Sequence, residues 1–460
     1  MFLRSVRNVK IFQNVMFFQI MKRSLSCSAR ETVRDLASKD GELRVFVVAG
    51  EVSGDIIASR FMNSLKKLSA LPVRFTGVGG LMMSKQGLKS LFPMEDLAIM
   101  GIWELLPHLS SFRIKLKETV KSALSFEPHV VLTVDSKGFS FRFLKHLRAR
   151  YGQLGLACPR HFHFVAPSFW AWRGGEARLK GLTDFVDHVF CILPFEAEVC
   201  RSNGLLATFV GHPTLEDILE LEVGKSTDQE WRIEGDGEKF RNVHGISSGS
   251  TIISVLPGSR LQEVTRMLPI FSHALELLKN DFSGLTAVIY VAPNKQVEDY
   301  IRKAVGMWPV PVVLVPGVTS CIKYNAFSAS RVALCASGTV AVELQLARLP
   351  CVVAYRAHIL TEWFIRYKAK IPYISLPNII LNSAIIPEAL FGACTPSHLA
   401  LLLRDLMNDE GLCKKQMDAA GKFINALSPN IRVSRNLTEG EPALVEFAPS
   451  MIAASVVLNS

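Results

Sequence analysis

Residues 333–343 read Ala-Leu-Cys-Ala-Ser-Gly-Thr-Val-Ala-Val-Glu, and this stretch decides the fold class. An apolar, strand-like run ends in the small turn Ser337-Gly338-Thr339, and a helix-like segment follows that carries Glu343. Strand, small-residue turn and helix in this order are typical of a place that holds a phosphate, because backbone N–H groups and a helix N-terminus are exposed there. We expect Glu343 to accept hydrogen bonds from the paired hydroxyls of a sugar.

A second candidate for phosphate binding lies upstream, where Pro257-Gly258-Ser259-Arg260 closes another apolar strand. Two such turns in one half of a long α/β chain predict a nucleotide-sugar site.

Apolar strands alternate with helices along most of the 460 residues. The alternation predicts parallel sheets covered by helices on both faces. Two series of strands are expected, the first at 43–49, 73–78, 130–134, 161–165 and 188–193, and the second at 251–256, 287–291, 312–315, 332–335 and 351–355. The chain is therefore expected to form two similar Rossmann-like domains that bind a ligand in the cleft between them, at the carboxyl ends of the strands.

The expected domains are residues 43–218 and 251–425. Residues 219–250 are polar and charged with glycine and serine clusters, so we interpret them as a linker or insert. Residues 426–460 form a C-terminal tail in this division, and the part from Pro429 lacks clear periodicity and is expected to be loosely ordered.

The first 30 residues are basic and amphipathic. They hold six of the arginines and lysines and no acid, a pattern typical of an organelle transit peptide, and we favour a mitochondrial address over residues 1–30. Taking these six charges from the net +11 leaves +5, so the remaining chain is only mildly basic and no nucleic-acid partner is expected.

Mean hydropathy is +0.25, yet no apolar run reaches about 18 residues, so the sequence predicts no membrane span. Nine cysteines are scattered without a Cys-x-x-Cys pair. They are interpreted as small buried residues in a reducing compartment, with no disulfide or zinc framework.

Candidate polar residues follow two strands of the first half. Glu51 and Ser53 lie in the turn Gly50-Glu-Val-Ser-Gly-Asp55, which suits sugar hydroxyls better than phosphate, or else is a simple capped turn. Asp135 closes the strand at 130–134, where it is either the general base for an acceptor hydroxyl or the cap of the next turn.

Aromatic residues gather in Pro167-Ser-Phe-Trp-Ala-Trp-Arg173. Trp172 can form a platform for sugar rings or acyl chains and Arg173 can bind a phosphate, while the alternative is an aromatic core cluster. His161 and His163 alternate on one strand and are interpreted as packing residues, because no carboxylate or cysteine completes a metal site.

The segment from Gly101 to Phe112 combines apolar residues with a basic helix that follows it. We interpret it as a patch that lies on an anionic membrane surface, with a core helix as the alternative. Its apolar members are Ile102, Trp103, Leu105, Leu106, Leu109 and Phe112.

Taken together, these motifs closely resemble the lipid-A-disaccharide synthase family. They occur in the family's order over residues 43–425. They are Ala49 to Asp55, Leu97 to Ile102, Pro167 to Arg173, Leu193-Pro-Phe-Glu196, Gly211-His-Pro213, Leu256 to Arg260, Ala336 to Thr339 with Glu343, Tyr355-Arg356 and Ser375-Leu-Pro-Asn378.

The resemblance implies a GT-B glycosyltransferase, an α/β fold of two Rossmann-like domains that face a cleft, with the acceptor side in 43–218 and the UDP-sugar side in 251–425. Such an enzyme transfers 2,3-diacylglucosamine from its UDP conjugate to 2,3-diacylglucosamine 1-phosphate, with inversion, at a membrane surface. The products are the lipid A disaccharide 1-phosphate and UDP. The resemblance implies no cofactor and no metal, since arginine and helix N–H groups can stabilise the leaving diphosphate.

The same resemblance implies roles for single residues. Asp135 matches the aspartate implicated as general base, and Arg260 matches the arginine expected near the donor diphosphate. The residues assigned to donor binding are Arg260, Ser337, Gly338, Thr339, Glu343 and Asn378. The residues assigned to the acceptor side of the cleft are Glu51, Ser53, Trp172 and Arg173.

One motif departs from the family. Ala-Pro-Asp-Phe-Asn usually follows the catalytic aspartate, whereas Asp135 is followed by Ser136-Lys137-Gly138-Phe139-Ser140. A carboxylate is missing and a lysine is added beside the site. With the N-terminal extension, this suggests an organellar member that works peripherally on the mitochondrial inner membrane or in the matrix, with a homodimer left open. The alternatives are another GT-B UDP-sugar enzyme and a non-catalytic lipid-binding descendant.

Overall fold

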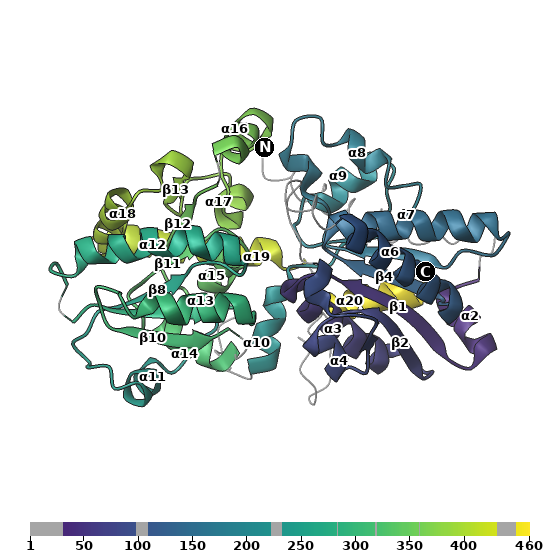
Figure 1. Cartoon of the computed structure of the whole chain (residues 1–460), viewed down its shortest axis with the longest axis horizontal. Helices are drawn as coiled ribbons and strands as arrows, with labels where there is room; N and C mark the ends of the chain where they lie inside the picture. The colour runs from purple at the N-terminus through teal and green to yellow at the C-terminus, as the bar shows by residue number, and fades with distance from the viewer. Residues whose placement is uncertain are drawn as a thin grey trace, which may run out of the picture.

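The computed structural model describes residues 31–97, 109–221, 232–282, 284–317, 320–357, 359–429 and 448–460. They form two α/β domains that lie side by side, each built on one parallel sheet (Figure 1). This is the arrangement predicted from the alternation of strands and helices.

The sheet of the N-terminal domain has the strand order β3-β2-β1-β4-β5-β6-β7. Its central strands are almost wholly apolar because helices cover both faces. The strands are β1 (Leu43–Ala49), β2 (Val73–Val78), β3 (Lys89–Ser90), β4 (Val130–Val134), β5 (Arg160–Phe164), β6 (His188–Cys191) and β7 (Ala207–Phe209).

Helices cover the two faces of this sheet with separate cores. One face is packed by α2 (Val33–Asp40), α3 (Val52–Leu68) and α20 (Pro449–Leu458), and the other mainly by α6 (Leu109–Phe126) and α7 (Lys137–Gln153). The shorter helices are α4 (Leu81–Lys85), α8 (Ala177–Lys180), α9 (Glu196–Ser202) and α10 (Glu216–Leu221).

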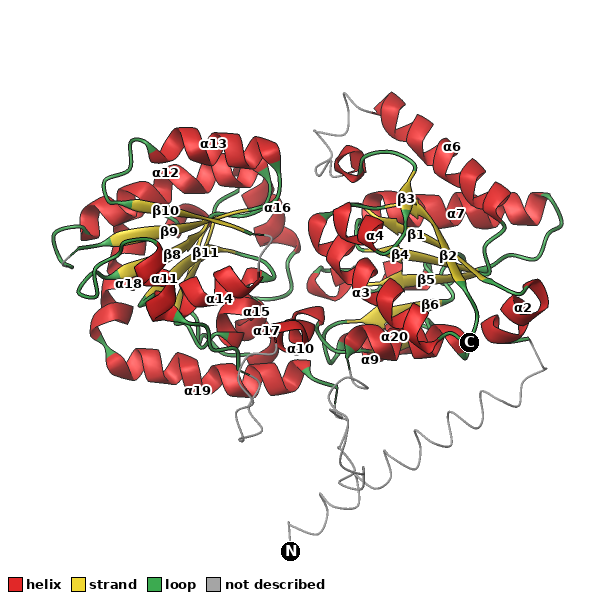
Figure 2. Cartoon of the chain, turned by 90° about the horizontal axis from the view of Figure 1, so that it is seen from below, coloured by secondary structure: helices red, strands yellow, loops and turns green. Residues whose placement is uncertain are grey.

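The sheet of the C-terminal domain has the order β10-β9-β8-β11-β12-β13 and is also parallel throughout (Figure 2). The strands are β8 (Ile252–Leu256), β9 (Thr286–Val291), β10 (Val312–Pro316), β11 (Val332–Ala336), β12 (Cys351–Tyr355) and β13 (Glu388–Leu390).

This second sheet also has a core on each face. Helices α12 (Leu261–Leu278), α13 (Lys295–Val305) and α18 (Pro396–Asn408) pack on one face. The other face carries α11 (Gly237–Val243), α14 (Ser320–Ala329), α15 (Val340–Leu346) and α19 (Glu410–Leu427). The remaining helices, α16 (Ile359–Lys368) and α17 (Leu376–Leu381), lie toward the junction of the domains (Figure 1).

No described helix combines the length and the apolarity that crossing a bilayer requires.

The end of the chain differs from the expected loose tail. Residues 449–458 form α20, whose Ala453, Ala454 and Val457 are fully buried against α3 and the first sheet. The expectation of poor order is therefore wrong for residues 448–460. The sequence did not reveal this helix because α20 is apolar around its whole circumference and therefore shows no amphipathic period. The domain boundaries themselves stay a prediction.

The chain passes between the domains at two adjacent places. The N–H of His212 donates to the Leu427 carbonyl oxygen over 3.2 Å. At Gly211, whose φ is +93°, a Cβ would lie 2.7 Å from Pro429 Cδ. Glycine is thus required at position 211 both by the backbone conformation and by the close approach of the segment at Leu427–Pro429.

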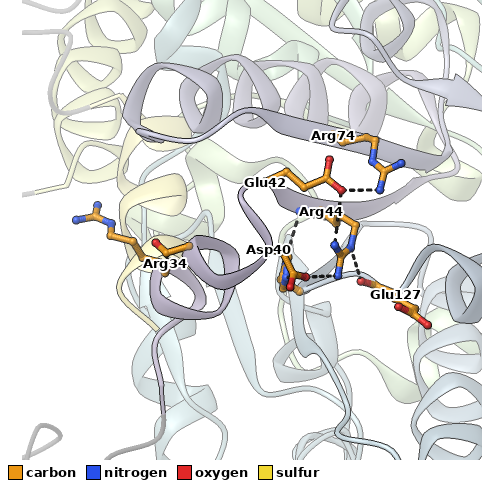
Figure 3. A network of polar contacts seen from close by, with 8 residues as sticks. Arg34, Asp40, Glu42, Arg44, Arg74 and Glu127 are labelled. Atoms are coloured by element: carbon orange, nitrogen blue, oxygen red, sulfur yellow. Dashed lines mark hydrogen bonds and ion pairs between the residues drawn. The ribbon is translucent and has the colours of Figure 1, made fainter.

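A polar network ties α2 to the amino ends of β1 and β4 (Figure 3). Arg44 Nη2 contacts Asp40 Oδ2 at 2.6 Å, and Arg44 Nε donates to the Glu127 carbonyl oxygen at 2.8 Å. Glu42 pairs with Arg74 at 2.6 Å. This network fixes the first strand at the end opposite to the candidate site.

Candidate active site

The carboxyl ends of the two sheets meet across the domain junction. β1 leads into Glu51, and β8 leads through its turn into Arg260. Arg260 Nη2 donates to Glu51 Oε2 over 2.9 Å. The structure therefore brings together one residue that the sequence assigned to the acceptor side and one assigned to the donor side.

Asp135 occupies the turn after β4, next to Glu51. Asp135 and Ser136 both adopt left-handed φ values, +47° and +44°, which cost energy in residues other than glycine. The Asp135 N–H donates to the Phe164 carbonyl oxygen at 3.0 Å, and Ser140 Oγ donates to the Asp135 carbonyl oxygen at 2.8 Å. These bonds hold the strained turn, and the Asp135 side chain stays half-buried.

Arg260 and Asp135 both affect the pKa of Glu51. Burial raises the pKa of Glu51 above its ordinary value, Arg260 opposes that rise and the charge of Asp135 adds to it. Two carboxylates and an arginine thus share one end of the cleft.

Lys137, the residue that departs from the family pattern, completes this charge cluster. Its Nζ donates to Ser168 Oγ over 3.1 Å. Burial lowers the pKa of Lys137, while the charges of Asp135, Glu196 and Glu51 oppose that change. The lysine is therefore a cation set among three carboxylates.

Glu196 is a buried member of this cluster for which the sequence predicted no role. Its Oε1 accepts from Trp170 Nε1 at 3.0 Å and its Oε2 accepts from the Leu193 N–H at 3.1 Å. Burial raises the pKa of Glu196 to about 7. The motif Leu193-Pro-Phe-Glu196, a carboxylate one turn into an otherwise apolar segment, was the signal that could have marked it.

The turn after β8 is shaped as predicted, but a side chain of the protein already fills it. Gly258 has φ +116°, and a Cβ there would lie 2.2 Å from Glu263 Oε2. Burial raises the pKa of Glu263, while Arg260 and the N–H groups of Ser259 and Arg260 oppose that rise. The N–H groups expected to face a phosphate therefore face a carboxylate.

The turn after β11 is open. Gly338 has φ +145° and, like Thr339, is exposed, while Ser337 is half-buried. Thr339 is the N-cap of α15 but its side chain makes no capping hydrogen bond. This turn keeps the shape that the sequence predicted for an anion site.

Glu343 lies on α15 and is not a free carboxylate. Lys323 Nζ from α14 pairs with Glu343 Oε1 at 2.9 Å. Burial alone would lower the pKa of Lys323, but the charges of Glu343 and Asp217 outweigh it and raise that pKa.

Asp217 extends this pair into a polar network that joins the domains. Its Oδ1 accepts from Arg60 Nη2 of α3 at 2.5 Å, and its Oδ2 accepts from the Tyr324 hydroxyl at 3.3 Å. Glu343 is thus connected through Asp217 to the N-terminal domain.

Asn378 differs from its expected role in donor binding. Its Nδ2 donates to the Ile386 carbonyl oxygen at 2.8 Å and to Glu388 Oε1 at 2.9 Å. Its Oδ1 accepts from the N–H groups of Ile385 and Ile386 at 3.0 and 2.9 Å. The side chain is fully buried with both amide atoms bonded, so it shapes a loop instead of facing the cleft.

The remaining acceptor-side residues line the junction. Trp172 forms an isolated antiparallel bridge with Ala369, and its ring lies 6.1 Å from that of Phe364 in the other domain. Arg173 is exposed beside it, and Ser53 lies half-buried in the first turn of α3. Trp172 is therefore a contact between domains and not part of a closed aromatic core.

Most of the expected membrane patch lies outside the described residues, namely Ile102, Trp103, Leu105 and Leu106. Leu109 begins α6, and its side chain also lies outside the description. Phe112 is half-buried, and its ring meets Phe139 edge-on at 5.4 Å. Phe112 packs in part on the core of the N-terminal domain, as the alternative of a core helix predicted, and its membrane contact stays a prediction.

The two alternating histidines are buried, as expected of packing residues. His161 Nδ1 lies 2.9 Å from the Phe185 carbonyl oxygen, and His163 Nδ1 lies 2.8 Å from Thr133 Oγ1. Burial lowers the pKa of His161 to about 4 and that of His163 to about 3, so both are neutral near pH 7.

Two parallel-sheet domains with strand-end turns facing one another define a GT-B glycosyltransferase fold. UDP-GlcNAc 2-epimerase from Neisseria meningitidis, solved with UDP-GlcNAc bound, has this fold. It matches with a TM-score of 0.55 and 12% identity, over 84% of this chain and 97% of that one. This likeness concerns the fold alone.

The chain belongs to the lipid-A-disaccharide synthetase family, whose model matches residues 45–439. It is 60% identical to the "Probable lipid-A-disaccharide synthase, mitochondrial" of Arabidopsis thaliana over 95% of each chain. It is 40% identical to the lipid-A-disaccharide synthase of Rhodospirillum centenum, over 91% of this chain and 94% of that protein.

Proposed function

We propose that this protein joins UDP-2,3-diacylglucosamine and 2,3-diacylglucosamine 1-phosphate into the lipid A disaccharide 1-phosphate and releases UDP. Membership of the family supports the reaction. Among the structural observations, the contact between Arg260 and Glu51 carries the proposal furthest, because it joins the donor turn to the acceptor turn beside Asp135.

In the proposed reaction, Asp135 takes the proton of the acceptor's 6-hydroxyl. The resulting oxygen attacks the anomeric carbon of the donor sugar, a new C–O bond forms, and the bond from that carbon to the UDP oxygen breaks. Attack from the side opposite to the leaving group inverts the anomeric centre. UDP leaves with the electron pair of the broken bond.

The donor end of the site stabilises the leaving diphosphate. Arg260 supplies a guanidinium, and the open turn Ser337-Gly338-Thr339 supplies N–H groups at the start of α15. Glu343, held by Lys323, accepts from the ribose hydroxyls. Asn378 supports this end indirectly through Glu388, which accepts from Asn378 Nδ2 and from the Ile374 N–H. The Ile374 carbonyl oxygen in turn lies 3.5 Å from Ser337 Oγ.

The acceptor end uses Glu51 and Ser53 for sugar hydroxyls, and Trp172 and Arg173 at the rim for the acyl and phosphate groups. Lys137 balances the negative charge around Asp135, which a second carboxylate in the family pattern would increase.

We further propose that the protein works peripherally at a mitochondrial membrane and has residues 1–30 as its targeting segment. The mitochondrial name of the Arabidopsis relative and the acid-free basic composition of these residues support the location. The segment with Ile102, Trp103, Leu105 and Leu106 is proposed to touch the membrane. A homodimer is compatible with this assignment and is tested by sedimentation velocity.

A turnover assay with the two acylated sugars tests the function. UDP release and appearance of the disaccharide are expected with the unmodified chain, and Asp135→Ala should lower kcat by about a hundredfold to ten-thousandfold while UDP affinity stays nearly unchanged. Asp184→Ala, which removes an exposed carboxylate just ahead of the amino end of β6, is the matched control and should keep full activity.

Two outcomes contradict the proposal in different ways. Full activity of Asp135→Ala refutes the base assignment only. No turnover of the acylated pair by a folded protein that still binds UDP refutes the reaction and favours a non-catalytic descendant.

A further inference from the structure

Helix α16 presents three large aromatic side chains to solvent. Trp363 is 68% exposed, Phe364 50% and Tyr367 59%. The rings of Trp363 and Tyr367, one helical turn apart, stack with centroids 5.9 Å apart and an interplanar angle of 6°. Exposed apolar side chains gathered on one helix mark an interaction surface, whereas single exposed apolar residues do not. We call Trp363, Phe364, Tyr367 and Lys368 the α16 face.

Positive charge accompanies these rings. Residues 359–370 hold Arg366, Lys368 and Lys370 against the single acid Glu362. Lys368 Nζ lies 5.3 Å from the centre of the Tyr367 ring, so this cation sits directly beside the aromatic surface. The other two cations pair with acids, Arg366 with Glu362 at 2.8 Å and Lys370 with Glu176 of the other domain at 2.7 Å.

The α16 face lies at the rim of the cleft. The ring of Phe364 is 6.1 Å from that of Trp172, and the Arg173 N–H donates to the Lys368 carbonyl oxygen at 2.8 Å. Figure 1 shows α16 at the edge of its domain, beside the junction with the N-terminal domain. Arg173 adds an exposed cation from the N-terminal domain, across that junction.

We propose that the α16 face docks on an anionic lipid bilayer. Tryptophan and tyrosine place an apolar ring at the level of the lipid head groups while their polar atoms stay hydrated, and lysine and arginine beside them attract anionic head groups. The lysine beside the rings favours a bilayer over a protein partner, because lysine is depleted at protein interfaces but attracts anionic head groups.

The position of the face adds a consequence that rests on the proposed function. A bilayer bound by α16 lies against the rim formed by Trp172 and Arg173, so acylated sugars reach the cleft without passing through water. The vesicle experiment below uses no acylated sugar, so its result is independent of whether the proposed reaction is right.

The test is co-sedimentation of the full chain with vesicles of equal parts phosphatidylcholine and phosphatidylglycerol, compared with pure phosphatidylcholine. The variant Trp363→Ser/Phe364→Ser/Tyr367→Ser should bind the anionic vesicles at least about tenfold more weakly than the unmodified chain. Lys368→Gln should weaken binding about fivefold, and this loss should disappear at high salt. Met307→Ser, at a position 88% exposed and outside the face, should bind like the unmodified chain.

Circular dichroism and thermal melting check folding, and Trp363→Ser alone serves if the triple variant does not fold. Unchanged vesicle binding of either folded variant overturns the proposal, as does equal binding of the unmodified chain to neutral and anionic vesicles. A triple variant that loses self-association in sedimentation velocity but keeps vesicle binding would assign the face to a second copy of the chain and also overturn it.

Discussion

Arg260 of the C-terminal domain contacts Glu51 of the N-terminal domain within the candidate site, and this contact makes the role of Arg260 testable. Arg260→Ala should weaken the affinity for UDP about ten- to a hundredfold, because hydrogen bonds to charged groups are worth roughly 1.5–3 kcal/mol. Calorimetric titration with UDP measures this.

Glu51→Gln is the matched control for Arg260, since it breaks the same 2.9 Å contact from the other side without removing the guanidinium. It should leave UDP affinity equal or tighter. Unchanged UDP affinity in Arg260→Ala would refute the diphosphate role.

The charge of Lys137 acts on the buried carboxyl of Glu196, and the ionisation of this carboxyl can be followed by fluorescence. Trp170 donates to Glu196, so ionisation of this carboxyl should change tryptophan fluorescence with a midpoint near its pKa of about 7. Lys137 lowers that pKa, so Lys137→Met should move the midpoint to higher pH, because a carboxylate that loses a neighbouring cation is harder to ionise.

Two variants control this experiment. Lys137→Arg should keep the midpoint, and Glu196→Gln should abolish the transition. A midpoint that stays in place in Lys137→Met would show that the lysine charge does not reach the carboxylate.

Single-residue roles were only partly predictable from the sequence. The positions of Asp135, Glu51 and Arg260 followed from the ends of apolar strands, because parallel strands share one carboxyl edge. The pairing of Glu343 with Lys323 and the carboxylate of Glu263 inside the phosphate-like turn depend on how helices pack in space. Neither contact can be predicted from the spacing of residues along the chain.

Among the elements, the long apolar strands were predicted within about two residues, since buried parallel strands read as continuous hydrophobic runs. The edge strands β3, β7 and β13 were missed because they span only two or three residues. They are too short to show a periodic pattern of apolar residues, and they are recognised as strands only by their pairing with the neighbouring strand.

The loop between α17 and β13 depends on Asn378. Asn378→Ala should lower the free energy of unfolding by about 2–4 kcal/mol, since it leaves the N–H groups of half-buried Ile385 and buried Ile386 without their acceptor. Urea denaturation measures the loss, and Ser383→Ala, on the exposed part of the same loop, should be nearly neutral. A loss below about 1 kcal/mol would contradict this structural role and favour a role of Asn378 in binding the donor.

At the scale of the whole molecule, buried histidines predict loss of stability in mild acid. Burial lowers the pKa of His161, His188 and His212 to about 4 and that of His163 to about 3, from an ordinary value of 6.5. The unfolded chain therefore takes up protons below about pH 6.5 that the folded chain refuses, and stability falls as pH falls.

Glu196 acts in the opposite direction. Its pKa is about 7 in the folded chain against an ordinary value of 4.5, so the folded chain keeps a proton that the unfolded chain releases. Glu196 therefore makes the folded state more stable as pH falls toward 4.5. Glu51, Glu263 and Glu343, whose pKa values burial also raises, act in the same direction as Glu196 and reduce the slope that the four histidines would give. Stability is therefore expected to fall between pH 6.5 and 5 by less than about 4 kcal/mol per pH unit. Urea denaturation across this interval checks it, and a flat profile would contradict the neutral buried state of the histidines.

The return of α20 to the first domain also sets an order of assembly. The Val33 N–H donates to the carbonyl oxygen of Ser460 over 2.8 Å, so the two ends of the described chain close one domain, and the other is inserted between them. A chain that emerges from a ribosome, or threads through an import pore, presents residues 251–427 complete before the last helix arrives. We expect the second domain to fold first, and the first domain to stay open until α20 has emerged.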